Sequence, residues 1–302
     1  MRHLYAWMTS ILLAIFFTIP AFAFAAENPA ANVGDAAGTS RNWSGYVATN
    51  GTFTGVSGSW TVPAVAPSES AQADATWVGI GGVSSSDLIQ IGTQAIAQSD
   101  GTSYEAWYEL LPGTSIPISM QVNAGDVMSA SILQQGTGSW LVSIHDNTND
   151  QSFSTTLSYS SSLSSAEWIE EMPSDQLGYI PLDSFGSVSF TGATAIKNGS
   201  GVTPADANAY SLTMIASANQ ALATTSSLGG DGSSFTVTRS SISANVAPRT
   251  VRGDGRGGFR RGGGGGSGAP SVHVRRARVF LTPTLFRIVS GAEGRFEEVI
   301  RL

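Results

Sequence analysis

Two short segments, far apart in the sequence, each carry one polar side chain that could take part in catalysis. Gln90 lies in the apolar segment 88–93, and Glu171 ends the segment 166–171. Side chains alternate between the two faces of a β-strand. An extended conformation therefore places Gln90 opposite its two isoleucine neighbours and places Glu171 on the face of Ile169. An amide and a carboxylate that face one cleft could activate a water molecule and stabilise an oxyanion.

Few other residues offer catalytic chemistry. The chain has no cysteine, which excludes thiol nucleophiles, disulfides and thiolate metal sites. Only His145 lies in the body of the chain, because His3 belongs to the N-terminal leader and His273 to the C-terminal tail. A polar run follows His145, so we expect a surface turn there rather than a Ser-His-Asp triad. With no multi-histidine cluster and no glycine-rich phosphate loop, the sequence predicts no metal, no cofactor and no nucleotide chemistry.

The N-terminus has the pattern of a secretory signal. Residues 1–25 begin with basic residues, continue with an apolar run and end with small residues that fit cleavage after Ala23 or Ala25. The apolar run is short for a membrane span, is interrupted by Pro20, and has no stop-transfer charges behind it. We therefore expect cleavage, secretion to the extracellular space and no membrane association afterwards.

The elements that must position the two catalytic candidates are β-strands. Short runs of alternating apolar residues recur along the body, separated by Gly, Asn, Asp and Pro. No stretch has the pattern of a long amphipathic helix. Many short strands at regular spacing predict an antiparallel all-β sandwich or barrel. The clearest alternating runs are 53–62, 116–122, 128–132, 140–144, 153–159, 188–190, 210–214 and 235–237.

Charge and composition divide the chain. Between the leader and residue 248 there are three basic and 18 acidic residues, a formal net charge of −15. From residue 249 onward, 11 arginines and four acidic residues give +7. An acidic body repels nucleic acid and anionic membranes. It also suits an acidic environment, although ordinary solubility charge is an equal explanation.

We divide the chain into four parts on these grounds. Residues 1–25 form the signal, 26–40 a linker or short pro-segment, 41–240 the β-sandwich domain, and 241–302 a Gly/Arg-rich tail. The tail is similar to RGG-type segments that bind nucleic acid. On an exported acidic protein such binding has little rationale, so we expect a disordered or artefactual extension and no nucleic-acid partner.

Seven short motifs in the body occur in an order that resembles the glutamic peptidases of family G1, the eqolisins, also called peptidase A4. The resemblance runs from about residue 41 to about residue 240. It implies a concanavalin A-like sandwich of two bent antiparallel sheets and an acid-acting, pepstatin-insensitive endopeptidase. The motifs are NWSGY (42–46), WTVP (60–63), TWVGIGG (76–82), LIQIG (88–92), YEAWYE (104–109), GD (125–126) and AEWIEE (166–171).

The resemblance assigns the catalytic roles to Gln90 and Glu171. The Glu171 carboxylate would take a proton from water and then deliver it to the leaving nitrogen, while the Gln90 amide would donate to the oxyanion. A neutral amide partner avoids the like-charge coupling of two carboxylates. A base that works in acid should not have a strongly raised pKa, so we expect the pKa of Glu171 to lie close to its ordinary value.

Aromatic residues are expected to line the peptide-binding groove. Trp77 and Trp107, with Tyr108, are assigned to substrate binding, and core packing is the alternative for the two tryptophans. Trp43 is expected in the core or on the groove floor. Glu109 matches a position near the active site of the family and, like Trp43, is assigned to substrate binding. The expected partners are polypeptide substrates, and the protein is expected to be a monomer.

Two departures from the family pattern and two alternative functions remain open. Gly81 stands where fungal members have aspartate, and Glu170 replaces an apolar residue but should face away from Glu171. A glycosidase could use Glu105 with Glu109 or Glu171 as its carboxyl pair. A non-catalytic carbohydrate- or protein-binding module of the same fold could use the aromatic groove.

Overall fold

The computed structural model describes residues 38–241, with gaps at 176–177 and 218–219. The predicted signal, most of the predicted linker and almost all of the tail lie outside these residues. All the regular secondary structure in these residues is β-strand. No helix in this part of the chain is long and apolar enough to cross a membrane.

The strands follow one another in chain order with mostly short connections. Their bounds are β1 Thr39–Ser40, β2 Trp43–Ala48, β3 Phe53–Thr61, β4 Gln72–Gly81, β5 Leu88–Gln98, β6 Gly101–Leu110, β7 Ile116–Ile118, β8 Val127–Gly136, β9 Ser139–Asp146, β10 Gln151–Ser158, β11 Ala166–Glu171, β12 Ser174–Asp175, β13 Gly178–Tyr179, β14 Ser187–Lys197, β15 Ser200–Val202, β16 Tyr210–Ser217, β17 Gln220–Thr225 and β18 Phe235–Arg239.

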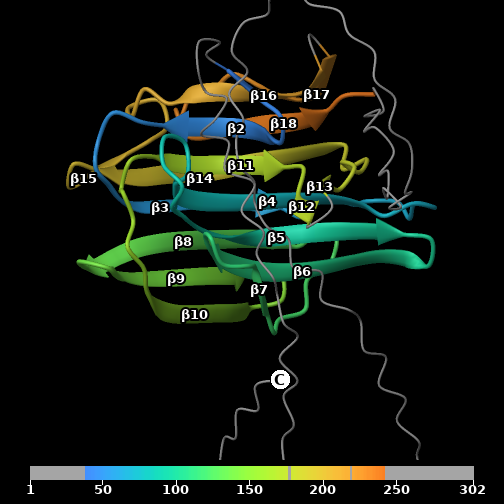
Figure 1. Ribbon diagram of the computed structural model, residues 1–302, viewed down its shortest axis with the longest axis horizontal. Helices are drawn as coiled ribbons and strands as arrows, with labels where there is room; N and C mark the ends of the chain where they lie inside the picture. The colour runs from blue at the N-terminus through green and yellow to red at the C-terminus, as the bar shows by residue number, and fades with distance from the viewer. Residues whose placement is uncertain (1–37, 176–177, 218–219, 242–302) are drawn as a thin grey trace, which may run out of the picture. The chain divides into compact units, whose positions relative to one another are not determined.

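The strands form two layers that share one strand. The first layer has the order β10-β9-β8-β3-β14-β18-β17-β16, and the second continues from β16 as β2-β11-β4-β5-β6-β7. Neighbours along this path are antiparallel, and β16 pairs with β17 on one side and β2 on the other. Figure 1 shows the second layer descending from β2 through β11, β4 and β5 to β6. This arrangement confirms the predicted antiparallel all-β sandwich.

The main core lies between the layers. Ile89 and Ile91 of β5 belong to the same apolar cluster as Trp60 of β3 and Phe190 of β14. Fully burying one such side chain contributes about 1.5–3 kcal/mol relative to leaving it in water. Because side chains alternate along β5, Gln90 points to the other face of the second layer. The predicted opposition of Gln90 to its isoleucine neighbours is therefore confirmed.

A second apolar cluster covers the outer face of the second layer. It includes Trp43, Trp77, Trp107 and Ile169, from four different strands. Glu171 lies on this face, since it is two residues from Ile169 on β11. The site is therefore built on a continuous sheet whose other face is fixed by the main core.

Candidate active site

Gln90 and Glu171 line one small pocket on the outer face of the second layer. They come from β5 and β11, which are separated in the sheet by β4 alone. The cavity volume is about 10 Å³, close to the minimum that one water molecule requires. The pocket is also lined by Ala75, Gln94, Trp107, Glu109, Ser115, Pro173 and Ser174.

Glu171 is surrounded by N–H donors although it is almost fully buried. The Asn42 side-chain amide donates to Oε1 at 3.0 Å, and the Trp77 indole donates to Oε2 at 2.7 Å. Burial raises the pKa of Glu171 to about 7, and these donors oppose part of that rise. The expectation that its pKa is not strongly raised is therefore wrong for this closed pocket. Burial disfavours the charged form by more than the donors favour it.

Gln90 is held by a second carboxyl group. Its Nε2 donates to Glu109 Oε2 at 2.5 Å, and both side chains are buried. The Gln90 Oε1 is also buried and has no hydrogen-bond partner within the described part of the chain. The amide is therefore anchored on one side and has an acceptor left for a bound water or substrate.

The tryptophans predicted to bind substrate take different positions. Trp77 is fully buried, and its indole N–H donates to Glu171. The ring of Trp43 packs edge-on against the ring of Trp77, with centroids 4.9 Å apart. Trp107 lines the pocket itself. The predicted groove residues Trp43 and Trp77 thus form the support beneath the carboxylate, and Trp107 forms part of the wall.

The structure does not bring Tyr108 together with these residues. Tyr108 is paired in register with Ile91, on the core face of the sheet, and stacks on Phe153 with ring centroids 5.9 Å apart. Its neighbours Trp107 and Glu109 point to the pocket face, because adjacent residues of a strand alternate. The consecutive aromatic residues Trp107 and Tyr108 therefore lie on opposite faces of the sheet, Trp107 at the pocket and Tyr108 in the core.

Glu170 points into the core, as alternation predicted, and lies among other buried acids. The Thr76 hydroxyl donates to its Oε2 at 2.7 Å. Burial raises its pKa to about 8, and it also repels Asp74, whose pKa burial raises well above the ordinary value. Asp183 completes the group, and burial together with Asp74 raises its pKa to about 10. We refer to Asp74, Glu170 and Asp183 as the core carboxyl cluster.

Several residues of the site were not assigned from the sequence. Asn42 stands in the first motif next to Trp43, yet only its distance to Glu171 identifies it as a donor. Gln94 lines the pocket and donates to Glu105. Gln94 lies four residues from Gln90 on β5, so both side chains face the same side of the sheet, and Gln94 pairs in register with Glu105. Strand alternation was the one sequence signal that could have placed Gln94 at the site.

The site has no arrangement suited to a metal. No group of three or more His, Asp or Glu side chains that could hold a metal ion occurs within residues 38–241, gaps excepted. The core carboxyl cluster instead consists of groups whose pKa burial raises, which disfavours the ionised form that a metal needs.

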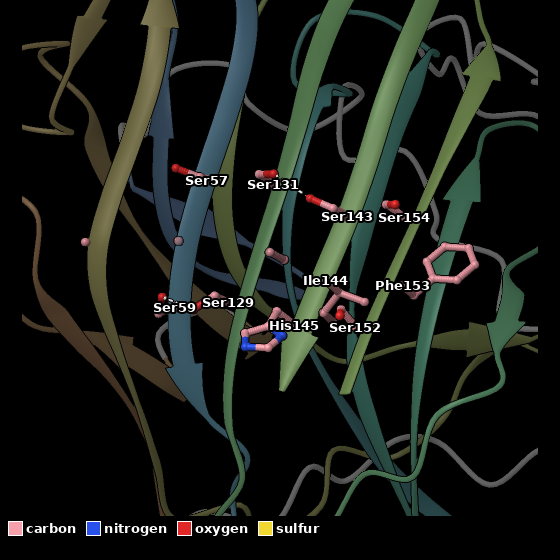
Figure 2. Close-up of a pocket in the computed structure, with 13 residues that line it drawn as sticks. Ser57, Ser59, Ser129, Ser131, Ser143, Ile144, His145, Ser152, Phe153 and Ser154 are labelled. Atoms are coloured by element: carbon pink, nitrogen blue, oxygen red, sulfur yellow. Dashed lines mark hydrogen bonds between the residues drawn. The ribbon is translucent and has the colours of Figure 1, made fainter. Parts of the chain in front are cut away.

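A larger hollow lies elsewhere, on the outer face of the first layer. It has a volume of about 480 Å³ and is lined mainly by serines of β3, β8, β9 and β10 (Figure 2). Several hydroxyls bind one another, including Ser59 with Ser129 at 2.7 Å and Ser131 with Ser143 at 2.8 Å. Neither Gln90 nor Glu171 lines this hollow.

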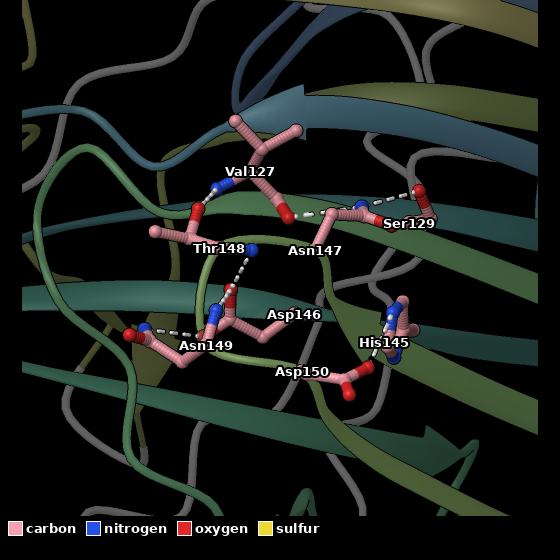
Figure 3. Close-up of polar contacts among 8 residues, drawn as sticks. All are labelled: Val127, Ser129, His145, Asp146, Asn147, Thr148, Asn149 and Asp150. Carbon is pink, nitrogen blue, oxygen red and sulfur yellow. Dashed lines mark hydrogen bonds and ion pairs between the residues drawn. The ribbon is translucent and has the colours of Figure 1, made fainter.

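His145 lies at the edge of this serine-lined hollow, at the end of β9. Its Nε2 is 3.7 Å from Asp150 Oδ1, and the Asp150 side chain is 98% exposed (Figure 3). The turn between β9 and β10 is held by Asp146, which accepts from the backbone N–H groups of Thr148 and Asn149. His145 therefore has the surface position beside a turn that its sequence context predicted.

Comparison with known proteins gives a consistent set of matches. The model of the peptidase A4 family matches residues 41–239. Aspergillopepsin-2 of Aspergillus niger is 29% identical over 224 residues, covering 66% of this chain and 77% of that protein.

Solved structures are similar over the same region. Scytalido-glutamic peptidase, in complex with a transition state analog inhibitor, matches with a TM-score of 0.58 and 26% identity, over 66% of this chain and 98% of that one. SCP-B, a member of the eqolisin family in complex with the tripeptide Ala-Ile-His, has a TM-score of 0.55 and 26% identity, over 66% and 98%. Aspergilloglutamic peptidase from Aspergillus niger has a TM-score of 0.50 and 30% identity, over 56% and 99%.

Proposed function

This chain belongs to the peptidase A4 family and is a glutamic-type peptidase, and we propose that it is an acid-acting endopeptidase with Glu171 and Gln90 as its catalytic pair. The observation that supports this pair is their shared pocket, in which a carboxyl group with two N–H donors and an anchored amide line a space of about one water. Polypeptides are the proposed substrates, in keeping with the tripeptide that occupies one solved relative.

Each step of amide hydrolysis has a group in this pocket. Glu171 as carboxylate removes a proton from the water, whose oxygen attacks the carbonyl carbon. The Gln90 N–H that is not bound to Glu109 donates to the oxygen that becomes negative. Glu171 then delivers the proton to the nitrogen as the carbon–nitrogen bond breaks. Burial favours the acid form and the donors Asn42 and Trp77 favour the carboxylate, so the residue can serve in both forms.

Acid action and pepstatin insensitivity are part of the proposal. Each pH unit below its pKa lowers the ionised fraction of Glu171 about tenfold, so activity in acid depends on the donors that keep part of it ionised. The core carboxyl cluster also supports acid action, because burial disfavours the charged form of its members and acid keeps them neutral. An aspartic dyad, the target of pepstatin, has no counterpart in the proposed pair.

Secretion is likewise proposed, on the pattern of residues 1–25. A basic start, an apolar run and small residues before position 26 are the features of a cleaved signal. Export places the enzyme outside the cell, where an acidic medium and unfolded polypeptides can be present together. N-terminal sequencing of the secreted protein tests this, and a mature chain that begins at residue 1 would overturn it.

Digestion of an unfolded protein tests the catalytic pair. We expect Glu171→Gln to abolish cleavage between about pH 2 and pH 6, a range that brackets ordinary carboxyl pKa values. Gln90→Ala should lower kcat by about 10²–10³, the usual effect of losing an oxyanion donor. Glu170→Gln is the matched control, because it makes the same chemical change at the neighbouring residue that faces the core, and it should remain active.

The two alternative functions give different results in the same assay. A glycosidase would release reducing sugar from a glycan and lose that activity in Glu171→Gln. A binding module would cut no unfolded protein at any pH in this range. Wild-type cleavage that survives pepstatin and disappears in Glu171→Gln supports the peptidase, whereas full activity of Glu171→Gln would refute the proposed pair.

A further inference from the structure

We propose that Glu109 is a positioning residue that fixes the orientation of the Gln90 amide, an inference that rests on the proposed function. A side-chain amide has a donor end and an acceptor end of nearly equal size. Rotating it by half a turn would present a carbonyl oxygen where the oxyanion forms, and two negative oxygens would then face each other. Catalysis by Gln90 therefore requires something that distinguishes its two ends.

In its ionised form Glu109 supplies that distinction, because a carboxylate can only accept hydrogen bonds. Gln90 Nε2 lies 2.5 Å from Glu109 Oε2, so the donor end is turned toward β6. The two residues face each other directly in the register of β5 and β6. Hydrogen bonds to a carboxylate are about twice as strong as those between neutral groups, which makes this orientation the favoured one.

The contact leaves the remaining groups of the amide free for chemistry. One of the two N–H bonds of Gln90 is used by Glu109, and the other remains for the oxyanion. Gln90 Oε1 is buried without a partner in the part of the chain that the structure describes. A water molecule in the pocket could donate to this oxygen while Glu171 removes its other proton.

Burial separates this role from substrate binding, which is the role that the sequence suggested for Glu109. Only 1% of Glu109 is exposed, and its carboxyl group accepts a hydrogen bond from the buried Gln90 amide. The similar pair Gln94–Glu105 lies four residues away along the same strands, and there the carboxyl group is half-buried. Glu109 therefore lines the pocket beside Gln90 and acts on the reaction through its hydrogen bond to the Gln90 amide.

Two substitutions at this position separate positioning from packing. Glu109→Gln keeps the shape of the side chain but can donate as well as accept, so it no longer distinguishes the ends of the Gln90 amide. Glu109→Asp shortens the side chain but keeps an acceptor-only group. We expect Glu109→Gln to lower kcat by about tenfold to a hundredfold, as misplaced catalytic groups do, with KM changed less than about twofold. Glu109→Asp should retain more activity than Glu109→Gln.

An activity-independent measurement accompanies the kinetics. The two side-chain protons of Gln90 should give separate nuclear magnetic resonance signals, with the one bound to Glu109 shifted downfield. That shift should persist in Glu109→Asp and in Glu171→Gln and diminish in Glu109→Gln. Glu69→Gln, which removes an exposed carboxyl group, is the control for the loss of one charge.

Opposite results would overturn the inference. A packing role predicts that Glu109→Gln is more active than Glu109→Asp, and a substrate contact predicts a raised KM at unchanged kcat. A Gln90 signal that is the same in all the variants would also refute positioning. If Gln90→Ala and Glu171→Gln are both active, the proposed function fails by itself, and the Gln90 signals still report whether Glu109 orients the amide.

Discussion

At the scale of single residues, β11 shows how one residue type acquires three characters. Glu171 has N–H donors from Asn42 and Trp77, whereas Glu170 has the hydroxyl of Thr76 and Glu167 has no N–H donor within the described contacts. Burial raises the pKa of all three. Hydrogen bonds oppose this rise in each case, but only Glu171 has N–H donors from two side chains, which suits a residue that must exchange a proton.

The sequence could predict the direction of these side chains but not their partners. Alternation along one strand is local, and it separated Glu171 from Glu170 correctly. The donors to Glu171 come from positions 129 and 94 residues away, and nothing in the local pattern marks them as donors. The raised pKa was missed for the same reason, because burial depends on segments packed over the site.

The Trp77 indole offers a direct test of how Glu171 is tuned. Trp77→Phe keeps an aromatic ring but removes the N–H that lies 2.7 Å from the carboxylate. A hydrogen bond to a charged group contributes about 2 kcal/mol, and its loss should raise the pKa of Glu171 by about one to two units. As a general base Glu171 works when ionised, so the acid limb of the kcat/KM profile should move to higher pH by that amount.

A second buried tryptophan provides the control for this measurement. Trp140 donates to the Tyr159 carbonyl, in the core and away from Glu171. Trp140→Phe should lower the free energy of unfolding without moving the acid limb. If both substitutions shift the limb equally, or if neither does, the Trp77 N–H does not tune Glu171.

At the scale of elements, the pocket depends on how closely β4 and β5 approach. A Cβ atom built on Gly92 would lie 2.2 Å from the Thr76 carbonyl oxygen and 2.5 Å from the Trp77 Cβ. Neither atom can move without shifting β4, which pairs with β5 on one side and β11 on the other. Gly92 therefore allows Trp77 to reach Glu171 from the strand between the two catalytic candidates.

Gly92→Ala should consequently affect both stability and catalysis. Overpacking at a site that cannot relax costs roughly 1–3 kcal/mol, and displacement of Trp77 should lower kcat in protein that remains folded. Thermal unfolding and single-turnover cleavage measure the two effects separately. Gly136→Ala is the matched control, since an added Cβ there meets nothing within 4 Å. Activity equal to wild type in folded Gly92→Ala would show that this close approach is dispensable.

The pattern of strands was largely predictable, and the exceptions have local causes. Alternation predicted an extended run over 116–122, but β7 ends at Ile118, because Met120 turns back to hydrogen-bond the Ile118 carbonyl. The run at 188–190 instead extends to Lys197 in β14, past a register shift between Thr191 and Thr194. Turns and bulges of this kind depend on backbone pairing with distant strands, which a single segment does not encode.

At the scale of the whole molecule, the two-layer arrangement could be predicted as a class but not in its connections. The joining of both layers through β16 depends on pairing between β2 and β16, which lie far apart in the chain. Such non-local pairing follows from the total burial of both layers rather than from any motif. The acidic body was evident from the sequence, but the burial of several of its carboxyl groups was not.

Buried carboxyl groups make the stability of the fold depend on pH. The folded-state pKa values of Glu171, Glu170 and Asp183 are raised to about 7, 8 and 10, and those of Asp74 and Glu167 are also raised. Ordinary unfolded carboxyls titrate near pH 4. Above that value the unfolded chain releases protons that the folded chain retains, so the free energy of unfolding should fall with rising pH.

Asp87, Asp146 and Asp231, whose pKa values are lowered, oppose this trend only in strong acid. Burial acts to raise the pKa of Asp87 and of Asp146, but several hydrogen bonds together outweigh it, from Ser162 and its neighbours at Asp87 and from Asn149 and Thr148 at Asp146. Hydrogen bonds from Ser233 and Ser234 lower the pKa of Asp231. Their contribution is present above the unfolded pKa and is lost as the pH falls below it. Maximum stability should therefore lie near pH 4, where unfolded carboxyls begin to ionise. Urea unfolding at a series of pH values measures this, and a maximum at or above pH 7 would contradict it.

A substitution in the core carboxyl cluster can remove the contribution of one residue, Glu170, to the pH dependence of the free energy of unfolding. Glu170→Gln has the shape of the protonated side chain and cannot ionise, and its amide can still accept from Thr76. Between pH 4 and pH 8 each retained proton costs the fold on the order of 1 kcal/mol per pH unit. The decline of unfolding free energy with pH should therefore become shallower by up to that amount in Glu170→Gln, while exposed Glu69→Gln should leave the slope unchanged. Equal slopes in Glu170→Gln and wild type would mean that Glu170 ionises alike in the folded and unfolded chains. The acid stability of the fold would then have to come from other buried carboxyls, with Asp74 and Asp183 the next to replace.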